Sequence, residues 1–350
     1  MILALVTPFY FPSVRGNSIT VQRIASELRD QGLGVEVYSL DRQDPETIRR
    51  DLARLRPDVV HGFHATATGS LTVAVAARLG VPAVISLTGT DVNQDLFDPR
   101  HRSAVLEALR AARAIVAFHQ VIRDKLCREA PALAGRVHVI GQAVRCDGES
   151  FDLRAALGLH PGDFIFFQPA GIRRVKNIPA VIPPLAALQR RYPHLCYVLA
   201  GPVIEPDEAE RITALLTGFP WARSLGAVDH ERVCAALNAV EIVINSSLSE
   251  GGMSNAVLEA MSKGVAVLAS DIEGNRSVIR DGEDGLLFGS EAEFLVKAER
   301  LLTDPAFRLR LGHRARQKVV AEFPLAGEIG KYLALYRALA AGSGAEAAWT

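Results

Sequence analysis

The chain has 350 residues, 49% of them hydrophobic and 22% charged, which is typical of a globular protein long enough for two domains. Lys and Arg number 39, as do Asp and Glu, so the formal net charge of zero argues against attraction of the whole chain to nucleic acid. No stretch reaches the ~18 apolar residues of a membrane span, and the first residues form no basic leader. We therefore expect a soluble, cytoplasmic protein without a transmembrane segment.

Apolar runs alternate with helical patterns through the first 140 residues. The run over 2–7 is unbroken, as expected for a strand that is buried on both faces of a sheet. The same patterns predict further strands over 35–40, 58–61, 83–87, 114–118 and 137–140, and helices over 18–29, 45–55, 71–79, 103–112 and 121–128.

The alternation lapses between 143 and 162, where we place a linker, and then starts again. The second series predicts strands over 164–168, 195–199, 224–225, 240–244, 265–268 and 286–288, and helices over 178–191, 208–216, 231–236, 276–280 and 328–340. Strands that alternate with helices of about ten residues indicate an α/β fold with two doubly wound parallel sheets. We expect one domain over 1–148 and a second over 149–327.

The four cysteines stand far apart and form no CxxC pair; they are Cys127, Cys146, Cys196 and Cys234. Zinc sites usually show paired cysteines, and disulfide frameworks belong to short, cysteine-rich secreted chains. We therefore expect reduced, buried thiols. No metal-binding cluster appears at the predicted turns either, so we expect no metal.

One stretch, residues 245–268, combines a strand end, a glycine turn and a helix start. The turn contains Glu250, Gly251 and Gly252, Ser254 is placed to cap the helix, and that helix carries Glu259. Free amide N–H groups at a helix start attract anions, and two flanking carboxylates can hold hydroxyls. The alternative is an ordinary turn with a surface glutamate.

A second turn, over 171–177, carries three cations. Since ligands of such sheets bind outside the carboxyl ends of the strands, we expect Arg173 and Lys176 to bind phosphate oxygens. For Arg174 we favour a solvated surface charge.

The motifs together resemble the retaining nucleotide-sugar glycosyltransferases of the GT-B fold, specifically the large family four. The second half carries G-I-R-R-V-K-N at 171–177, S-L-G-A-V-D-H-E at 224–231, S-L-S-E-G-G-M-S-N-A-V-L-E-A-M at 247–261, G-V-A-V-L-A-S-D-I-E-G-N at 264–275 and D-G-E-D-G-L-L-F at 281–288. The first half matches more weakly, through G-N-x-x-T at 16–20, D-V-V-H at 58–61 and T-G-T-D at 88–91. That opening is similar to the glycosyltransferase-1-domain proteins.

The resemblance implies a catalytic set of Arg173, Lys176 and Glu250, with the two cations on the donor diphosphate. Glu259 is implied to bind the ribose hydroxyls, and Val228 the nucleobase. The resemblance implies further donor contacts from Gly16, Asn17, Gly171, Gly251, Gly252, Met253, Ser254 and Asn255. It also implies that the helix over 328–340 packs back on the first domain.

Four departures from the family pattern affect the site. The spacing between arginine and lysine in the 171–177 turn is short, which leaves the choice between Arg173 and Arg174 open, and Ser277 stands where many members carry glutamate. Glu250 and Glu259 are nine positions apart where eight is usual, which leaves open whether Glu250 points into the donor site or away from it. Thr88 stands where many members carry histidine, and His61 or His64 is a candidate replacement on the acceptor side, together with Asp91. A satisfied structural histidine is an equal alternative for His61.

The implied reaction is transfer of a sugar from a nucleoside-diphosphate donor, most commonly UDP-linked, with retention of configuration and without a metal or cofactor. The sequence does not decide whether the acceptor is a small molecule, a glycan or a lipid. It also leaves peripheral membrane contact and the oligomeric state open. A non-catalytic, hydrolytic or epimerising relative is the main alternative. A solute-binding protein usually needs an export signal, and a dehydrogenase a GxGxxG turn, and the sequence shows neither.

Overall fold

The computed structural model describes residues 1–11, 16–147 and 150–342. The chain divides into two compact units, which we call unit 1 and unit 2. Unit 1 comprises Met1–Ala143 together with the chain from Leu325 onward, and unit 2 comprises Val144–Pro324. The first crossing therefore lies five residues before the expected boundary, and the return lies three residues before it. Among the described residues, no helix combines the length and the apolar character that crossing a bilayer requires.

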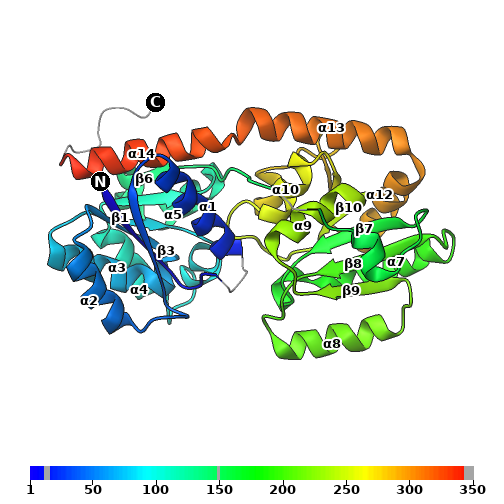
Figure 1. Ribbon diagram of the computed structural model, residues 1–350, viewed down its shortest axis with the longest axis horizontal. Coiled ribbons are helices and arrows are strands. Elements are labelled where there is room, and N and C mark those ends of the chain that lie inside the picture. Colours follow the sequence, from blue (N-terminus) through cyan, green and yellow to red (C-terminus); the bar gives the residue numbers. More distant parts are fainter. Residues whose placement is uncertain (12–15, 148–149, 343–350) are drawn as a thin grey trace. The chain divides into compact units, whose positions relative to one another are not determined.

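Unit 1 contains a six-stranded parallel sheet in the order β2-β1-β3-β4-β5-β6 (Figure 1). Its strands are β1 Ile2–Thr7, β2 Gly34–Ser39, β3 Val59–Phe63, β4 Ala83–Ser86, β5 Ala114–Ala117 and β6 Val137–Val139. Its α-helices are α1 Gly16–Asp30, α2 Pro45–Leu55, α3 Ala65–Leu79, α4 Arg102–Ala111, α5 Gln120–Glu129 and α14 Leu325–Ala340.

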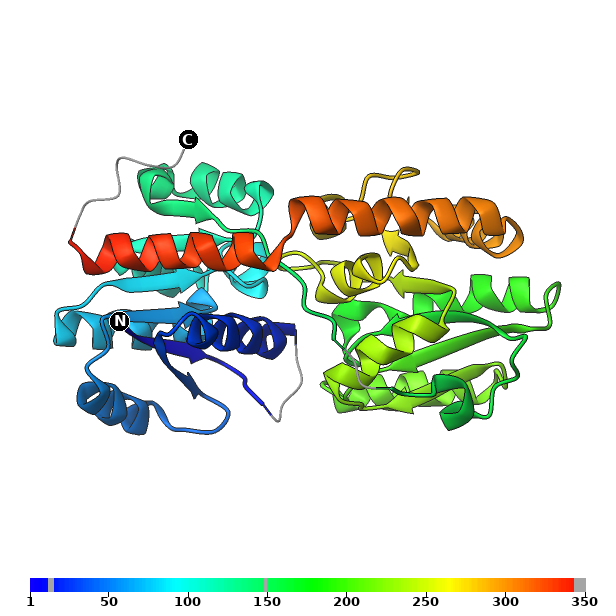
Figure 2. The same ribbon diagram turned by 45° about the horizontal axis from the view of Figure 1, so that its top comes forward.

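One face of this sheet is covered by α1 and by α14 from the end of the chain. Tyr332 and Tyr336 of α14 are fully buried in one cluster with Leu3, Leu5 and Phe63 of the sheet. Figure 2 shows α14 in red beside unit 1. Arg23 of α1 donates two hydrogen bonds of 3.0 Å to the carboxylate of Glu328, and both side chains are buried. The core of unit 1 is thus completed by residues from the far end of the sequence.

Unit 2 contains a second six-stranded parallel sheet, in the order β12-β11-β10-β7-β8-β9. Its strands are β7 Phe164–Pro169, β8 Leu195–Ala200, β9 Ala222–Gly226, β10 Ile242–Asn245, β11 Ala266–Ser270 and β12 Leu286–Phe288. Its α-helices are α6 Leu153–Leu157, α7 Ile182–Gln189, α8 Pro206–Thr217, α9 His230–Ala236, α10 Asn255–Ser262, α11 Glu273–Arg276, α12 Glu291–Thr303 and α13 Pro305–Glu322.

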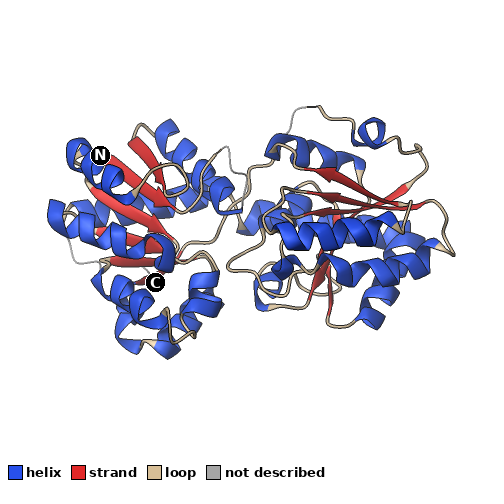
Figure 3. Cartoon of the chain, turned by 90° about the horizontal axis from the view of Figure 1, so that it is seen from below, coloured by secondary structure: helices blue, strands red, loops and turns tan. Residues whose placement is uncertain are grey.

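Helices cover both faces of the second sheet, as Figure 3 shows for each unit. Alternate residues of a strand point to opposite faces. Accordingly Phe166 packs in a cluster with α7, α8 and α12, whereas Ile165 and Phe167 pack in a cluster with α9, α10 and α13. Both doubly wound sheets and the α/β class that the sequence predicted are confirmed.

The strand order of unit 2 reverses between β7 and β10. The chain leaves β7 toward β8 and β9 on one side, and returns to place β10 on the other side. Ligands of doubly wound sheets bind at this switch point, outside the carboxyl ends of the two strands. We therefore expect a ligand to bind at the turn after Pro169 and the loop after Asn245.

The clearest error in the predicted elements is the helix over 276–280. The structure has α11 earlier, over Glu273–Arg276, and a turn follows. The carboxylate of Asp284 accepts a hydrogen bond from the backbone N–H of Arg280, and that of Asp281 accepts one from Leu287. These side chains take the place of helical partners and hold the turn before β12.

Candidate donor site and its neighbours

The two segments at the switch point are tied to each other through their backbones. Leu248 N–H donates to the carbonyl oxygen of Val175 (2.8 Å), and the Ser246 hydroxyl donates to that of Lys176 (2.7 Å). A short 3₁₀ turn, Arg174–Lys176, ends at Asn177, which has a φ of 45°. The turn and the loop thus present their side chains at one edge of the sheet.

Lys176 and Glu250 form the centre of this edge. The Lys176 ammonium lies 2.6 Å from the Glu250 carboxylate. The same carboxylate oxygen accepts hydrogen bonds from Ser247 Oγ (2.7 Å) and Asn245 Nδ2 (3.1 Å). Burial raises the pKa of Glu250, but the charge of Lys176 and these hydrogen bonds outweigh it and lower the pKa below its usual value. Glu250 is therefore a carboxylate, and it points at the catalytic cation that the sequence predicted.

Gly274 explains why Glu250 takes this position. A Cβ atom on Gly274 would lie 2.6 Å from Cβ of Glu250 and 2.9 Å from the carbonyl oxygen of Gly252. Only a residue without a side chain leaves room for the loop there. The wider spacing of the two glutamates therefore does not turn Glu250 away from Lys176.

The two neighbouring arginines of the turn differ. Arg174 is exposed, and its backbone N–H donates to Glu205 (3.0 Å). Arg173 is half-buried, and its Nε is buried without a hydrogen-bond partner. Because an unpaired buried donor is costly, Arg173 is the arginine that gains most from an anion at this edge. The buried Nε therefore favours Arg173 over Arg174, a choice that the resemblance left open.

The loop over 251–255 leads into α10, and its expected cap is different in the structure. Ser254 occupies the N-cap position, but its side chain makes no capping bond to the helix. Its hydroxyl instead accepts a hydrogen bond from Asn245 Nδ2 (2.9 Å), which ties the helix start to the end of β10. Gly252 and Met253 are buried, whereas Gly251 and Asn255 are partly exposed.

Glu259 lies on α10 and is 4% exposed. Its Oε1 is 2.7 Å from Nε2 of His230, the first residue of α9. Val228, two residues before His230, is partly buried against the core cluster that contains Ile165 and Phe167. Gly171, at the start of the β7 turn, packs against Ile204. The ribose, nucleobase and phosphate contacts of these residues stay predictions.

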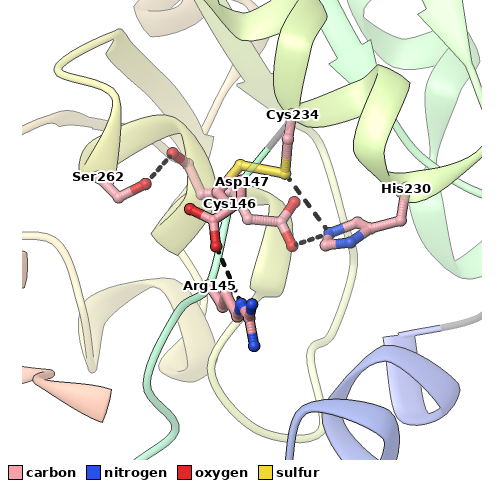
Figure 4. The surroundings of a disulfide bond; sticks show 7 residues. Arg145, Cys146, Asp147, His230, Cys234 and Ser262 are labelled. Atoms are coloured by element: carbon pink, nitrogen blue, oxygen red, sulfur yellow. Dashed lines mark hydrogen bonds and ion pairs between the residues drawn. A yellow bond between two sulfur atoms is a disulfide. The ribbon is translucent and has the colours of Figure 1, made fainter. Parts of the chain in front are cut away.

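The expectation of four reduced thiols is wrong for two of them. Cys146 and Cys234 form a disulfide, with their Cα atoms 5.3 Å apart, and Cys127 and Cys196 are free. Figure 4 shows this bond with His230 pointing toward it. No sequence pattern indicated the pairing, because the two cysteines are 88 residues apart and lie in different segments.

Unit 1 carries the remaining predicted residues, on α1, on β3 and in the segments that follow β3 and β4. Asn17 donates to Thr7 Oγ1 (3.0 Å) at the end of β1, and Gly16 is the first residue of α1. Asp91 is fully buried, and its carboxylate accepts backbone hydrogen bonds from Ala65, Thr88, Gly89 and Val92. Asp91 therefore positions the loop after β4.

The two candidate histidines differ in exposure. His61 is fully buried, with Nδ1 2.7 Å from Tyr336 Oη and Nε2 2.8 Å from Ser86 Oγ, and burial lowers its pKa to about 3. This favours the structural alternative for His61. His64 is partly exposed, adopts a φ of 83°, and places Nε2 2.7 Å from Thr90 Oγ1. Its Nδ1 accepts a hydrogen bond from the Ala67 N–H (3.2 Å) and so caps α3, and its acceptor-side role stays a prediction.

Sequence reasoning missed three residues that contact the predicted set: Asn245, Ser247 and His230. Asn245 is the last residue of β10, so its place at a strand end was an available signal. His230 lies inside the 224–231 motif, but a histidine at a helix start has no contact that its sequence position predicts.

Two family models match the chain. The model for "Glycosyl transferases group 1" matches residues 163–304, and the model for "Glycosyltransferase Family 4" matches residues 40–147. Glycosyltransferase 1 domain-containing protein 1 of Xenopus tropicalis is 29% identical over 238 residues, which cover 66% of this chain and 69% of that protein. Alpha-D-kanosaminyltransferase of Streptomyces kanamyceticus is 25% identical over 312 residues, covering 83% and 80%.

Solved structures share the fold at low sequence identity. The Anabaena protein HepE in complex with UDP-glucose is 16% identical with a TM-score of 0.81, covering 97% of this chain and 100% of that one. Sucrose-phosphate synthase of Thermosynechococcus elongatus is 18% identical with a TM-score of 0.83, covering 98% and 100%. These likenesses show that the fold is that of the GT-B glycosyltransferases. The chain belongs to the group 1 glycosyltransferases, as its motifs indicated.

Proposed function

We propose that the protein transfers a sugar from a UDP-sugar to an acceptor hydroxyl with retention of the anomeric configuration. The observation that carries the proposal is the Lys176–Glu250 pair at the switch point, beside the half-buried Arg173. A further support is that HepE, which shares the fold, binds UDP and UDP-glucose.

Lys176 has hydrogen-bond donors left for a phosphate although it is paired with Glu250. An ammonium group has three N–H donors, so Lys176 is able to hold Glu250 and a diphosphate oxygen at the same time. Glu250 fixes the ammonium in one place before the donor arrives, which lowers the reorganisation needed in the transition state. Arg173 would add a second cation for the departing diphosphate.

The transfer needs no general base of its own in this proposal. The leaving phosphate takes the proton of the acceptor hydroxyl, while the protein holds the acceptor against the anomeric carbon. Positive side chains stabilise the negative charge that develops on the diphosphate, so the step itself requires no metal. The acceptor is a small molecule, a glycan or a lipid.

The test is a panel of UDP-, GDP- and ADP-sugars, measured by thermal unfolding and by nucleotide release with and without candidate acceptors. A donor at 100 times its Kd adds about 2.7 kcal/mol to the free energy of unfolding. For a unit of this size, that raises Tm by roughly 5–10 °C. Stabilisation by UDP-sugars, with UDP release that depends on acceptor, is expected.

Other outcomes of the panel separate the alternatives. UDP release together with free sugar in the absence of acceptor indicates a hydrolytic relative. Stabilisation without any release indicates a non-catalytic one. Stabilisation by GDP- or ADP-sugars alone overturns the assignment of the base.

A further inference from the structure

Four side chains with metal-binding atoms meet between α9, α10 and the segment that enters unit 2. His230 and Cys234 are four residues apart on α9, so they share one face of the helix. The ligand atoms of His230, Cys234 and Glu259 all lie within 4.8 Å of one another. The sulfur of Cys146 is bonded to that of Cys234 and therefore belongs to the same cluster. No other group of three or more His, Cys, Asp or Glu in residues 1–11, 16–147 and 150–342 is as compact.

The cluster is shielded from water but has one accessible side. Cys234 is 0% exposed, Glu259 4% and Cys146 8%, whereas the side chain of His230 is 19% exposed. A buried carboxylate needs a partner, and His230 supplies a hydrogen bond of 2.7 Å. Entry past His230 would bring an ion directly to the Glu259 carboxylate and the Cys234 sulfur, which are both within reach of Nε2.

The donor set matches one class of ion. Two sulfurs, one imidazole nitrogen and one carboxylate oxygen are the ligand types of tetrahedral Zn²⁺. Bond lengths of 2.0–2.3 Å around such an ion place its ligand atoms about 3.3–3.8 Å apart. The observed separations are 2.7 Å between His230 Nε2 and Glu259 Oε1, and 3.8 Å between His230 Nε2 and Cys234 Sγ. Small side-chain rotations reach the required geometry once the S–S bond is open.

We propose that Cys146, Cys234, His230 and Glu259 form a Zn²⁺ site when the Cys146–Cys234 disulfide is reduced, so that the disulfide is the oxidised form of a metal centre. The transfer reaction proposed above has no step at this site, although Glu259 is also the residue predicted to bind the donor ribose. Metal binding here stands on the cluster alone and does not rest on the proposed donor role of Glu259.

The change of state balances with a dithiol as reductant. The dithiol gives two electrons and two protons, the S–S bond breaks, two thiols form, and the dithiol becomes a disulfide. Zn²⁺ then displaces both thiol protons into solvent and takes two thiolates, the carboxylate and the neutral imidazole through Nε2. The proton of the neutral imidazole sits on Nδ1 in this state, so the hydrogen bond from His230 to Glu259 is replaced by the two metal bonds.

The test uses the full chain with Co²⁺ as a spectroscopic probe. The protein is reduced with dithiothreitol, freed of reductant without air, and titrated with Co²⁺ and then Zn²⁺. We expect one equivalent of Co²⁺, with a thiolate-to-cobalt charge-transfer band and the visible bands of tetrahedral cobalt, and we expect Zn²⁺ to displace it. The oxidised protein should bind at least tenfold more weakly. Thiol titration of the unfolded chain should give two thiols before reduction and four after it.

Matched variants locate the site. Cys146→Ser and Cys234→Ser should each weaken the charge-transfer band and the Co²⁺ affinity at least tenfold, and His230→Ala should lower the affinity while both thiols remain. Cys196→Ser is the control, because Cys196 is a buried free thiol outside the cluster. Circular dichroism checks that each variant is folded. The proposal is overturned if the reduced protein binds no Co²⁺, or if Cys196→Ser and Cys234→Ser have the same effect.

Discussion

Lys176 and Glu250 lie 74 residues apart in the sequence, and their charged groups are 2.6 Å apart in the structure. The pair joins the segments that follow β7 and β10, the two strands between which the sheet order reverses. Both side chains are mostly buried, at 15% and 11% exposure. An ion pair therefore joins the two segments at the switch point of unit 2, and the same pair is the centre of the candidate site.

Lys176→Met, compared with the double variant Lys176→Met/Glu250→Gln, should separate the effect of Lys176 on stability from its effect on turnover. The methionine keeps most of the aliphatic stem but removes the cation, so we expect turnover to fall about 10²–10³-fold. The unpaired Glu250 carboxylate should also cost about 3 kcal/mol of stability. The double variant Lys176→Met/Glu250→Gln removes both charges, so it should recover much of the stability and none of the turnover. Steady-state kinetics and urea unfolding of the wild type and the two variants measure both effects, and wild-type turnover in Lys176→Met would refute the assignment.

Arg173→Ala and Arg174→Ala form a matched pair. Arg173 has a buried Nε without a partner, and Arg174 is exposed. We expect Arg173→Ala to lower kcat by at least tenfold and to weaken UDP binding, because it removes a cation beside the diphosphate. Arg174→Ala should change kcat less than twofold. Equal losses in the two variants would show that the turn acts through its total charge.

Gly274→Ala tests the position of Glu250 without touching a charged group. The new methyl group would meet Cβ of Glu250 at 2.6 Å, so the loop must move. We expect a loss of turnover of at least tenfold and a loss of stability of about 1–3 kcal/mol. Gly330→Ala is the control, because a Cβ on Gly330 of α14 meets nothing within 4 Å. A Gly274→Ala enzyme with normal kinetics would show that the loop tolerates the shift.

His61 should make the protein less stable in mild acid. Its pKa is lowered from 6.5 to about 3 by burial, so between these values the unfolded chain binds a proton that the folded chain does not. The free energy of unfolding should therefore fall by about 1.4 kcal/mol for each pH unit below 6.5. His61→Gln removes this contribution, and urea unfolding at pH 7 and pH 5 measures the change in slope. His194→Gln, at an exposed histidine, controls for the loss of a histidine as such.

The sheets and the two switch-point segments were predictable because strand periodicity and strand-end position are local properties of the sequence. The run over 2–7 and the turn over 171–177 needed no knowledge of distant residues. The motifs indicated the family for the same reason, since each of them, such as the one over 247–261, is a short continuous segment.

Other contacts depend on residues that meet only after folding. The burial of His61 depends on Tyr336, 275 residues away, and the position of Glu250 depends on the missing side chain of Gly274. The Ser254 hydroxyl does not cap α10, because it accepts a hydrogen bond from Asn245 Nδ2 instead of one from a backbone N–H of the helix. The disulfide joins two segments that no sequence pattern connects.

The return of α14 to unit 1 has a consequence for synthesis of the chain. Tyr332 and Tyr336 complete the first core, yet all of Val144–Pro324 is translated before them. The first unit therefore leaves the ribosome with the part of its sheet that α14 covers still exposed, and its core is completed only after the second unit has been made. Unit 2, by contrast, lies wholly on one continuous segment, Val144–Pro324, so the later half of this protein is the one equipped to fold first.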